Sequence, residues 1–294
     1  NRCLGLWSDT DTIWLDDSAD LAMNIGSLSA SKVTGLGMSD GVDYSELEVM
    51  ILNLGLGMDQ FTVLNTHAGT TTLNASKGDD KISLQAVSGT TTVNAGEGAD
   101  TLRVGSKAPS PGGNVNGIGA AVFLNGESGD DTLFVDDRND ATFNTGRLTA
   151  TSLTGMGMSA GITYDSIQQL NIDLAAGPDE FVVESTHTGV TAIHGQGGND
   201  ALFGEKGADT IHGGLGDDFL DGGAGNDSLF GNEGDDTLEG GDGETAGDDI
   251  LDGGPGTDTA SFLNANAGVM VSLADSGQQQ TGGAGNDTLT GIEN

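Results

Sequence analysis

Short runs in which apolar and polar residues alternate recur along the chain. Clear examples are TTTLNAS from Thr70, TTTVNAG from Thr90 and VTAIHGQ from Val190, in which threonines alternate with aliphatic residues. Alternation with a period of two, made by β-branched residues, is typical of strands that bury one face. The pattern therefore predicts an all-β fold built from many short strands.

A second pattern, with a period of nine residues, occupies residues 195–261. The units read GQGGNDALF, GEKGADTIH, GGLGDDFLD, GGAGNDSLF, GNEGDDTLE, GGDGETAGDDILD and GGPGTDTAS, of which the sixth has four extra residues. Aspartate stands sixth in each regular unit, and the motif aspartates are Asp200, Asp209, Asp218, Asp227, Asp236, Asp249 and Asp258. An apolar residue follows two places later, so each aspartate precedes a short strand whose middle side chain enters a core. Two units then form one coil, and turns two units apart stack.

Longer repeats precede this segment. Residues 11–80 align without gaps with residues 131–200, an offset of 120 that indicates duplication of a structural unit. A shorter G-x-D-x-apolar motif recurs at Asp59, Asp80, Asp100, Asp131 and Asp179. Each step of about 20 residues is interpreted as one coil with two strands, and longer steps as coils with insertions. Residues 105–119 hold two of the four prolines and are the expected surface loop.

Composition limits the possible partners. Nine basic residues against 45 acidic ones give a net charge of −36, which disfavours nucleic acid and anionic membranes as partners. Bound divalent cations would relieve the self-repulsion of so acidic a chain. No run of 18 apolar residues that could span a membrane is present, and Cys3 is the only cysteine, so an intrachain disulfide is excluded.

The nonapeptides resemble the GGxGxDxUx repeat of RTX proteins, the hemolysin-type calcium-binding repeats, which form calcium-binding parallel β-helices. The resemblance extends to the segment after Ser261, where residues 282–290 form one more nonapeptide with Asp287 in sixth place. The glycines at positions one, two and four are expected to take positive φ and turn their carbonyls toward an ion. Calcium prefers six to eight oxygen ligands, which carbonyls and aspartates supply. The expected ligand set is the motif aspartates, Asp287 and the first glycine of each of the first six units: Gly195, Gly204, Gly213, Gly222, Gly231 and Gly240.

Stacking should divide the motif aspartates between two edges of the coil. Asp200, Asp218, Asp236 and Asp258 fall on one edge, and Asp209, Asp227 and Asp249 on the other. About five ions would lie between successive turns, and we expect the insert at residues 244–247 to interrupt the stack. The alternative is a flexible glycine-rich linker. The upstream G-x-D aspartates either bind calcium as well or cap their own turns.

Other chemistry is weaker in the sequence. Two G-x-S-x-G pentads place Ser39 and Ser159 in a duplicated glycine turn with no helical pattern after them, unlike a hydrolase elbow. His67 and His187 occupy equivalent repeat positions, which indicates structural roles, and no HExxH zinc motif occurs. Adjacent carboxylates such as Asp217 and Asp218 are explained by the motif without a glycosidase site. We therefore expect no catalytic residues.

The predicted fold is a right-handed parallel β-solenoid, with wide two-stranded coils leading into an RTX-type calcium β-roll; the handedness follows from the resemblance and from crossover preference. Its expected parts are residues 1–130, a first solenoid unit; 131–194, the start of a second copy; 195–261, the nonapeptide β-roll; and 262–294, a strand plus a truncated further repeat. The predicted function is a non-catalytic, calcium-stabilised structural or adhesive segment of a secreted or cell-surface bacterial protein. Self-association or cell-surface polysaccharide are possible further partners. The alternatives are a calcium-binding accessory module of a secreted protease, lipase or epimerase, and a polysaccharide-binding solenoid.

Overall fold

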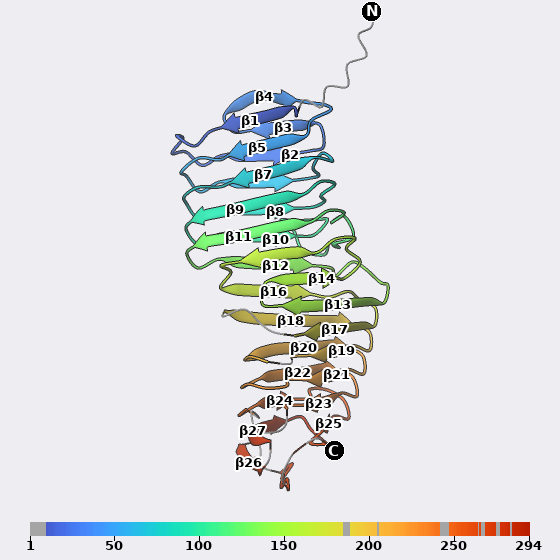
Figure 1. Ribbon diagram of the computed structural model, residues 1–294. Coiled ribbons are helices and arrows are strands. Elements are labelled where there is room, and N and C mark those ends of the chain that lie inside the picture. Colours follow the sequence, from blue (N-terminus) through green and yellow to red (C-terminus); the bar gives the residue numbers. More distant parts are fainter. Residues whose placement is uncertain are drawn as a thin grey trace, which may run out of the picture.

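Two long β-sheets lie face to face in this computed structural model and run from one end of the elongated molecule to the other (Figure 1). The structure describes residues 10–184, 189–204, 206–241, 247–263, 265, 268–274, 277–282 and 284–294. Within these residues all regular elements are strands, and most neighbouring strands are parallel. The predicted all-β parallel solenoid is confirmed, whereas its handedness stays a prediction. Cys3 and His187 lie outside the described residues.

Successive half-coils contribute strands alternately to the two sheets. Sheet A contains, in spatial order, β1 (Thr12–Asp16), β5 (Val49–Asn53), β7 (Thr70–Asn74), β9 (Thr91–Glu97), β11 (Val122–Ser128), β15 (Ile162–Asp165), β14 (Ser152–Gly155), β13 (Asn144–Thr149), β17 (Asp179–Val183), β19 (Ala201–Phe203), β21 (Phe219–Asp221), β23 (Thr237–Glu239) and β25 (Thr259–Ala260). Sheet B contains β26 (Gln278–Gly282), β27 (Gly285–Thr290), β24 (Ile250–Asp252), β22 (Ser228–Glu233), β20 (Asp209–Leu215), β18 (Val190–Gly197), β16 (Gln169–Asp173), β12 (Thr132–Asp136), β10 (Thr101–Val104), β8 (Lys81–Leu84), β6 (Gln60–Val63), β2 (Ile25–Leu28), β3 (Lys32–Gly35) and β4 (Met38–Asp43).

The core is a thin layer of aliphatic side chains between the sheets. Leu202 pairs in register with Leu220, which pairs with Leu238, and all three are fully buried. On the facing sheet, Ile211 and Leu229 are buried in the same way. These are the apolar residues that follow each motif aspartate, so the sequence prediction that two units form one coil is confirmed. Each strand buries its middle side chain because neighbouring side chains point to opposite faces.

The two copies of the duplicated unit lie in opposite sheets. The first strand of copy one, β1, belongs to sheet A, whereas its equivalent 120 residues later, β12, belongs to sheet B. The unit therefore spans an odd number of half-coils, and the second copy is turned by half a coil relative to the first. Sequence periodicity alone did not reveal this exchange.

The longest coils contain antiparallel insertions. In each copy the glycine turn joins strands that run antiparallel, as β2, β3 and β4 do in one copy and β13, β14 and β15 do in the other. Residues 105–119 are only partly the surface loop that was expected. Val115 and Ile118 are fully buried, because the loop folds back over the neighbouring coil and inserts both side chains into the core.

An asparagine ladder runs along sheet A. The side-chain amide of Asn74 donates to Asn53 (2.7 Å), that of Asn94 donates to Asn74 (2.7 Å), and that of Asn125 donates to Asn94 (2.6 Å). These residues pair in register on β5, β7, β9 and β11. In this ladder the asparagine side chains form hydrogen bonds with one another and need no contact with the turns. Sequence analysis missed it. The signal was present, since the runs from Thr70 and Thr90 place asparagine at the same position.

Candidate calcium-binding turns

The motif aspartates form two continuous ladders, one along an edge of each sheet. On the edge of sheet A, the backbone N–H of Asp200 donates to Oδ1 of Asp218, Asp218 donates to Asp236, and Asp236 donates to Asp258, each at 2.8 Å. The predicted assignment of these aspartates to one edge is confirmed. Glu293, which the sequence analysis did not single out, ends the ladder by accepting the N–H of Asp258 (2.8 Å).

The second ladder follows the edge of sheet B. Asp209 donates to Asp227 (2.8 Å) and Asp227 donates to Asp249 (2.9 Å). Asp249 donates in turn to Asp287 (3.0 Å), so the isolated nonapeptide at the end of the chain continues the stack. Each of the two ladders thus contains three hydrogen-bonded pairs of motif aspartates.

The expected interruption at the insert is wrong. The contact between Asp227 and Asp249 joins the turns on either side of it with ordinary geometry. Gly247 occupies the place two residues before Asp249, as the fourth-position glycine does in other units, and packs against Gly225. The turn that carries Asp249 therefore keeps its place in the stack; residues 242–246 lie outside the described residues.

The upstream G-x-D aspartates stack in the same manner. Asp59 donates to Asp80 (2.6 Å), Asp80 to Asp100 (2.7 Å), and Asp100 to Asp131 (2.9 Å), and this ladder ends on the side-chain oxygen of Gln168. Asp179 donates to Asp200 (2.7 Å) and thereby joins the sheet A ladder.

One carboxylate oxygen of almost every ladder aspartate lacks a partner. Oδ1 accepts the N–H of the preceding coil, whereas Oδ2 is buried without a hydrogen bond. This holds for Asp80, Asp100, Asp131, Asp200, Asp218, Asp227, Asp236, Asp249 and Asp258, whereas both carboxylate oxygens of Asp209 are buried without a hydrogen bond. Asp59 and Asp179 differ, because their Oδ2 atoms accept N–H groups of their own turns, from Gly55 (3.0 Å) and Ala175 (3.1 Å). Oδ2 of Asp287 accepts the hydroxyl of Thr281 (2.6 Å). Buried, unpaired carboxylate oxygens are costly unless a cation or a proton compensates them.

Glycine at position one serves close packing rather than positive φ. A Cβ added to Gly213 would lie 2.2 Å from Oδ2 of Asp218, and one added to Gly231 would lie 2.2 Å from Oδ2 of Asp236. All seven first-position glycines, including Gly253 of the last unit, face the carboxylate of their own unit in this way, and positive φ occurs instead at positions two and four, as at Gly214 and Gly216. The sequence-based reason given for position one is therefore wrong: the missing Cβ leaves room for the carboxylate.

Burial raises the pKa of the ladder aspartates when no cation is present. Desolvation is the main cause, and neighbouring carboxylates add to it. The pKa of Asp200 rises to about 8, those of Asp209, Asp218, Asp227 and Asp249 to about 7, and that of Asp236 to about 6. Bound protons or a bound cation therefore relieve the cost of burying these carboxylates.

Comparison with known families identifies the repeats. The family described as RTX calcium-binding nonapeptide repeat matches residues 120–140, 194–229, 212–244, 245–260 and 281–291. The chain carries RTX calcium-binding repeats. RTX repeats of this kind bind Ca²⁺, and here they form a calcium-binding β-roll segment. No curated protein matches this chain.

The turns of these RTX repeats fit calcium. Unpaired carboxylate oxygens, a glycine in place of a Cβ and nearby carbonyls make an all-oxygen donor set, which a hard cation requires. Among the described residues, no group of three or more acidic, histidine or cysteine side chains is arranged to hold a metal. Backbone carbonyls must therefore supply part of the coordination.

The glycine that leaves room for the carboxylate is present in one upstream turn and absent from others. Asp131 has Gly126 five residues before it, and a Cβ at that glycine would lie 2.6 Å from Oδ2 of Asp131. Asp80 and Asp100 have Ala75 and Ala95 in that place, and both alanines are fully buried. Only the turn of Asp131 shares the glycine of the repeats, and it lies within the matched residues 120–140.

The remaining candidate groups have structural explanations. Gly37 and Gly157 of the G-x-S-x-G pentads have φ of 68° and 75°, so the first glycine of each pentad forms a left-handed turn next to an antiparallel strand. His67 is buried edge-on against Tyr44. No helix in the described part of the chain is long and apolar enough to cross a membrane.

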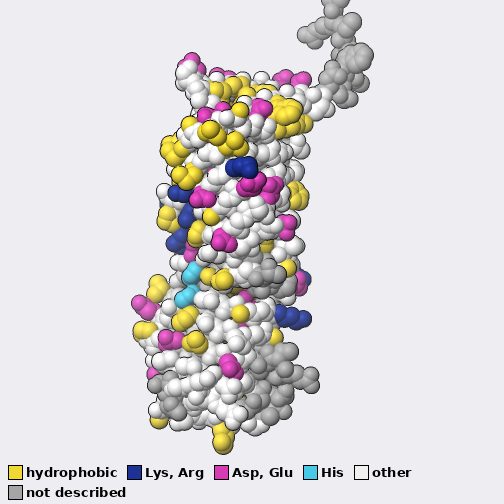
Figure 2. All heavy atoms as spheres, turned by 90° about the vertical axis from the view of Figure 1, so that its left-hand side faces the viewer, with side chains coloured by type: hydrophobic (Ala, Val, Ile, Leu, Met, Phe, Trp, Pro, Cys, Tyr) yellow, Lys and Arg dark blue, Asp and Glu magenta, His cyan; other side chains and the backbone are white. Residues whose placement is uncertain are grey.

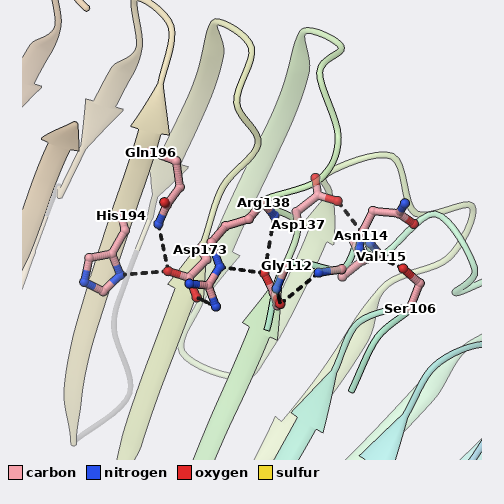
Figure 3. Close-up of polar contacts among 11 residues, drawn as sticks. Ser106, Gly112, Asn114, Val115, Asp137, Arg138, Asp173, His194 and Gln196 are labelled. Atoms are coloured by element: carbon pink, nitrogen blue, oxygen red, sulfur yellow. Dashed lines mark hydrogen bonds and ion pairs between the residues drawn. The ribbon is translucent and has the colours of Figure 1, made fainter. Parts of the chain in front are cut away.

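Sheet B also carries a stack of rings on its outer face. The His212 ring stacks on His194 (5.0 Å between centroids) and on Phe230 (4.6 Å). Nδ1 of His194 lies 3.4 Å from Asp173, as Figure 3 shows. A groove of about 290 Å³ runs beside the two histidines, which appear together on the surface in Figure 2. Sequence analysis did not single out this groove.

Proposed function

We propose that this chain is a non-catalytic structural segment of a secreted or cell-surface bacterial protein, and that extracellular calcium stabilises its fold. The observation that carries the proposal is the pair of aspartate ladders with buried, unpaired Oδ2 atoms. The ligands would be the motif aspartates and Asp287, together with carbonyls of the turns, including those of the first-position glycines. When bound, calcium supplies the positive charge that these buried carboxylates need.

Calcium would thereby couple location to folding. A chain with a net charge of −36 and few aromatic residues is poorly ordered without cations. A ligand that binds only the folded state stabilises it in proportion to the logarithm of its concentration. At the low calcium level inside a cell the β-roll would stay unfolded, and at about millimolar calcium outside it would fold. Secretion as an unfolded chain followed by folding outside agrees with this behaviour.

Circular dichroism and ion counting test the proposal. Calcium added to chelator-treated protein should produce a β-sheet spectrum, and native mass spectrometry should count up to three ions for each edge of the repeat segment. Magnesium is the control cation, because it prefers a strict octahedron and dehydrates reluctantly. A spectrum and an ion count that do not respond to calcium contradict the proposal.

The non-catalytic role has its own test. Ser39 lies on β4 and Ser159 in the segment between β14 and β15, both within the antiparallel insertions, which explains both serines without a nucleophile. The calcium-loaded chain should show no ester, peptide or glycoside hydrolysis. Activity that disappears in Ser39→Ala or Ser159→Ala would contradict the assignment and favour the alternative of a secreted enzyme.

A polysaccharide is the second candidate partner, favoured by the groove beside His194 and His212. The groove is also lined by Gln196, Asn232 and Glu233, which offer hydrogen-bond donors and acceptors beside the ring edges. A glycan array probed at constant calcium tests this. Glycan binding that is lost in Asn232→Ala, with the calcium response unchanged, would support a polysaccharide partner. If no glycan binds, the polysaccharide candidate is refuted and only the structural role is left.

A further inference from the structure

The N-terminal end of the solenoid exposes a strand edge and an acidic turn. β1 is the end strand of sheet A and pairs with β5 on one side. Trp14 on this strand is 65% exposed, and Figure 2 shows hydrophobic side chains gathered at this end of the molecule. The turn 16–20 follows β1, with Asp16 exposed and Asp17 and Asp20 half-buried. We call β1, Trp14 and this turn the N-terminal face.

The duplicate of this face, 120 residues later, is covered by another part of the chain. β12, the equivalent of β1, pairs with β16 on one side and with β10 on the other. The guanidinium of Arg103 on β10 lies 3.9 Å from the ring centroid of Phe134, which is the equivalent of Trp14. Leu133 and Val135 of β12 are fully buried, whereas Ile13 and Leu15 of β1 are only partly buried.

Residues 105–119 cover the duplicate of the acidic turn. Oδ2 of Asp136 accepts the backbone N–H groups of Gly112 (2.7 Å) and Gly113 (3.1 Å). Figure 3 shows this loop beside the turn.

The two other acidic side chains of the duplicate turn bind the same loop. Oδ1 of Asp137 accepts the N–H of Val115 (3.0 Å), and Oδ2 of Asp140 accepts the side-chain amide of Asn116 (3.0 Å). Asp137 is only 1% exposed as a result.

Within residues 10–184, the N-terminal face has the acceptors of its duplicate but no counterpart of the loop that donates to them. Asp16, Asp17 and Asp20 are the equivalents of Asp136, Asp137 and Asp140. Their hydrogen bonds come from N–H groups of their own turn and from the amides of Asn24 and Asn53. The same acidic pattern is thus open in one copy and occupied in the other.

We propose that the N-terminal face is a docking site for a solenoid coil with the chemistry of residues 100–116. Such a coil contributes a strand parallel to β1, a basic side chain over Trp14, and a glycine-rich loop. Two N–H groups of that loop bind Asp16, a third binds Asp17, and a side-chain amide binds Asp20. The N–H before the strand binds Asp11, as Asp100 binds Asp131 in the duplicate. Parallel edge pairing provides affinity, and the acidic turn fixes the register.

A peptide with the sequence of residues 97–119 tests this on the full chain, at constant millimolar calcium so that the result is independent of calcium-induced folding. Trp7→Phe makes Trp14 the only tryptophan. Saturable binding should shift Trp14 emission to shorter wavelength and slow amide exchange of residues 12–17 by at least about tenfold. Asp16→Ala should abolish both effects, whereas the matched control Asp165→Ala, on β15, should preserve them.

A second experiment links the docking coil covalently to the chain, so that binding no longer depends on peptide concentration. Residues 97–129 are repeated immediately before residue 10, which restores the junction found between residues 129 and 130. Trp14 should become shielded from acrylamide, and replacing Gly112 and Gly113 of the added copy by proline, which has no N–H, should reverse the shielding. The proposal is overturned if the linked chain leaves both Trp14 emission and amide exchange of β1 unchanged. It is equally overturned if those amides are already protected in the full chain alone.

Discussion

The ladder aspartates predict that calcium-free protein is stabilised by acid. Their pKa values rise in the folded state from 3.8 to between about 6 and about 8, mainly because burial disfavours the charged form. A raised folded-state pKa means that the stabilising contribution is complete below the unfolded pKa and is lost as the pH rises through the folded pKa. We therefore expect calcium-depleted protein to gain β-structure as the pH falls from 8 to 5.

The magnitude follows from the individual groups. For an aspartate with a folded pKa of about 7, such as Asp227, raising the pH from 5 to 8 removes about 3 kcal/mol of stability. These carboxylates are at most 3% exposed, so solvent screens them little. Six such aspartates in the repeats together lose on the order of 15 kcal/mol, which equals the whole stability of a typical domain. The calcium-free β-roll should thus be unfolded at pH 8.

The assay is a pH titration followed by circular dichroism, with and without calcium. Saturating calcium should hold the β-sheet signal at pH 8, because the cation replaces the protons. Asp227→Asn keeps the Oδ1 acceptor and removes one charge, so it should raise the midpoint of acid-induced folding in calcium-free protein and weaken the calcium response. Asp217→Asn, an exposed neighbour of the ladder, is the charge-matched control. A calcium-free signal that is strongest at pH 8 would refute the reasoning.

Three further predictions concern single positions. Gly213→Ala should lower calcium affinity at least about tenfold in a calorimetric titration, because its Cβ would lie 2.2 Å from Oδ2 of Asp218; unchanged affinity would contradict the packing role of position one. Asp131→Asn should remove one ion from the mass-spectrometric count and Asp80→Asn none, since only Asp131 faces a glycine, and equal losses would refute the distinction. Asn94→Ala should lower the free energy of unfolding by about 2 kcal/mol and Asn125→Ala by about half as much, because Asn94 loses two ladder bonds. Urea unfolding in calcium measures both, and equal costs would contradict a continuous ladder.

The parts of the fold that depend on one residue type at a fixed spacing could be predicted from sequence. The aspartate ladders and the buried leucines follow from the nine-residue period, because it brings the motif aspartates to one turn of the coil and the apolar residue two places later, such as Leu220, into the core. The function of position one could not be predicted, because the sequence shows a glycine but not the carboxylate that occupies the space beside it. The covering of turn 136–140 by residues 105–119 was also missed, because those contacts use backbone N–H groups, which every sequence possesses.

The ladder, rather than the length of the repeat, sets the register of the stack. The same contact from a backbone N–H to Oδ1 joins aspartates that are 18, 22, 31 and 38 residues apart. The inserted residues change neither the contact nor the burial of the apolar residue two places after the motif aspartate, as Leu251 and Leu289 show. A nine-residue period is therefore sufficient for the stack but not necessary. We propose that a calcium-binding turn is distinguished by the glycine five residues before the aspartate, or by its structural equivalent Gly240 where the insert intervenes. An inserted coil can thus keep its place in the solenoid and still lose the ion, as we expect for the turns of Asp80 and Asp100.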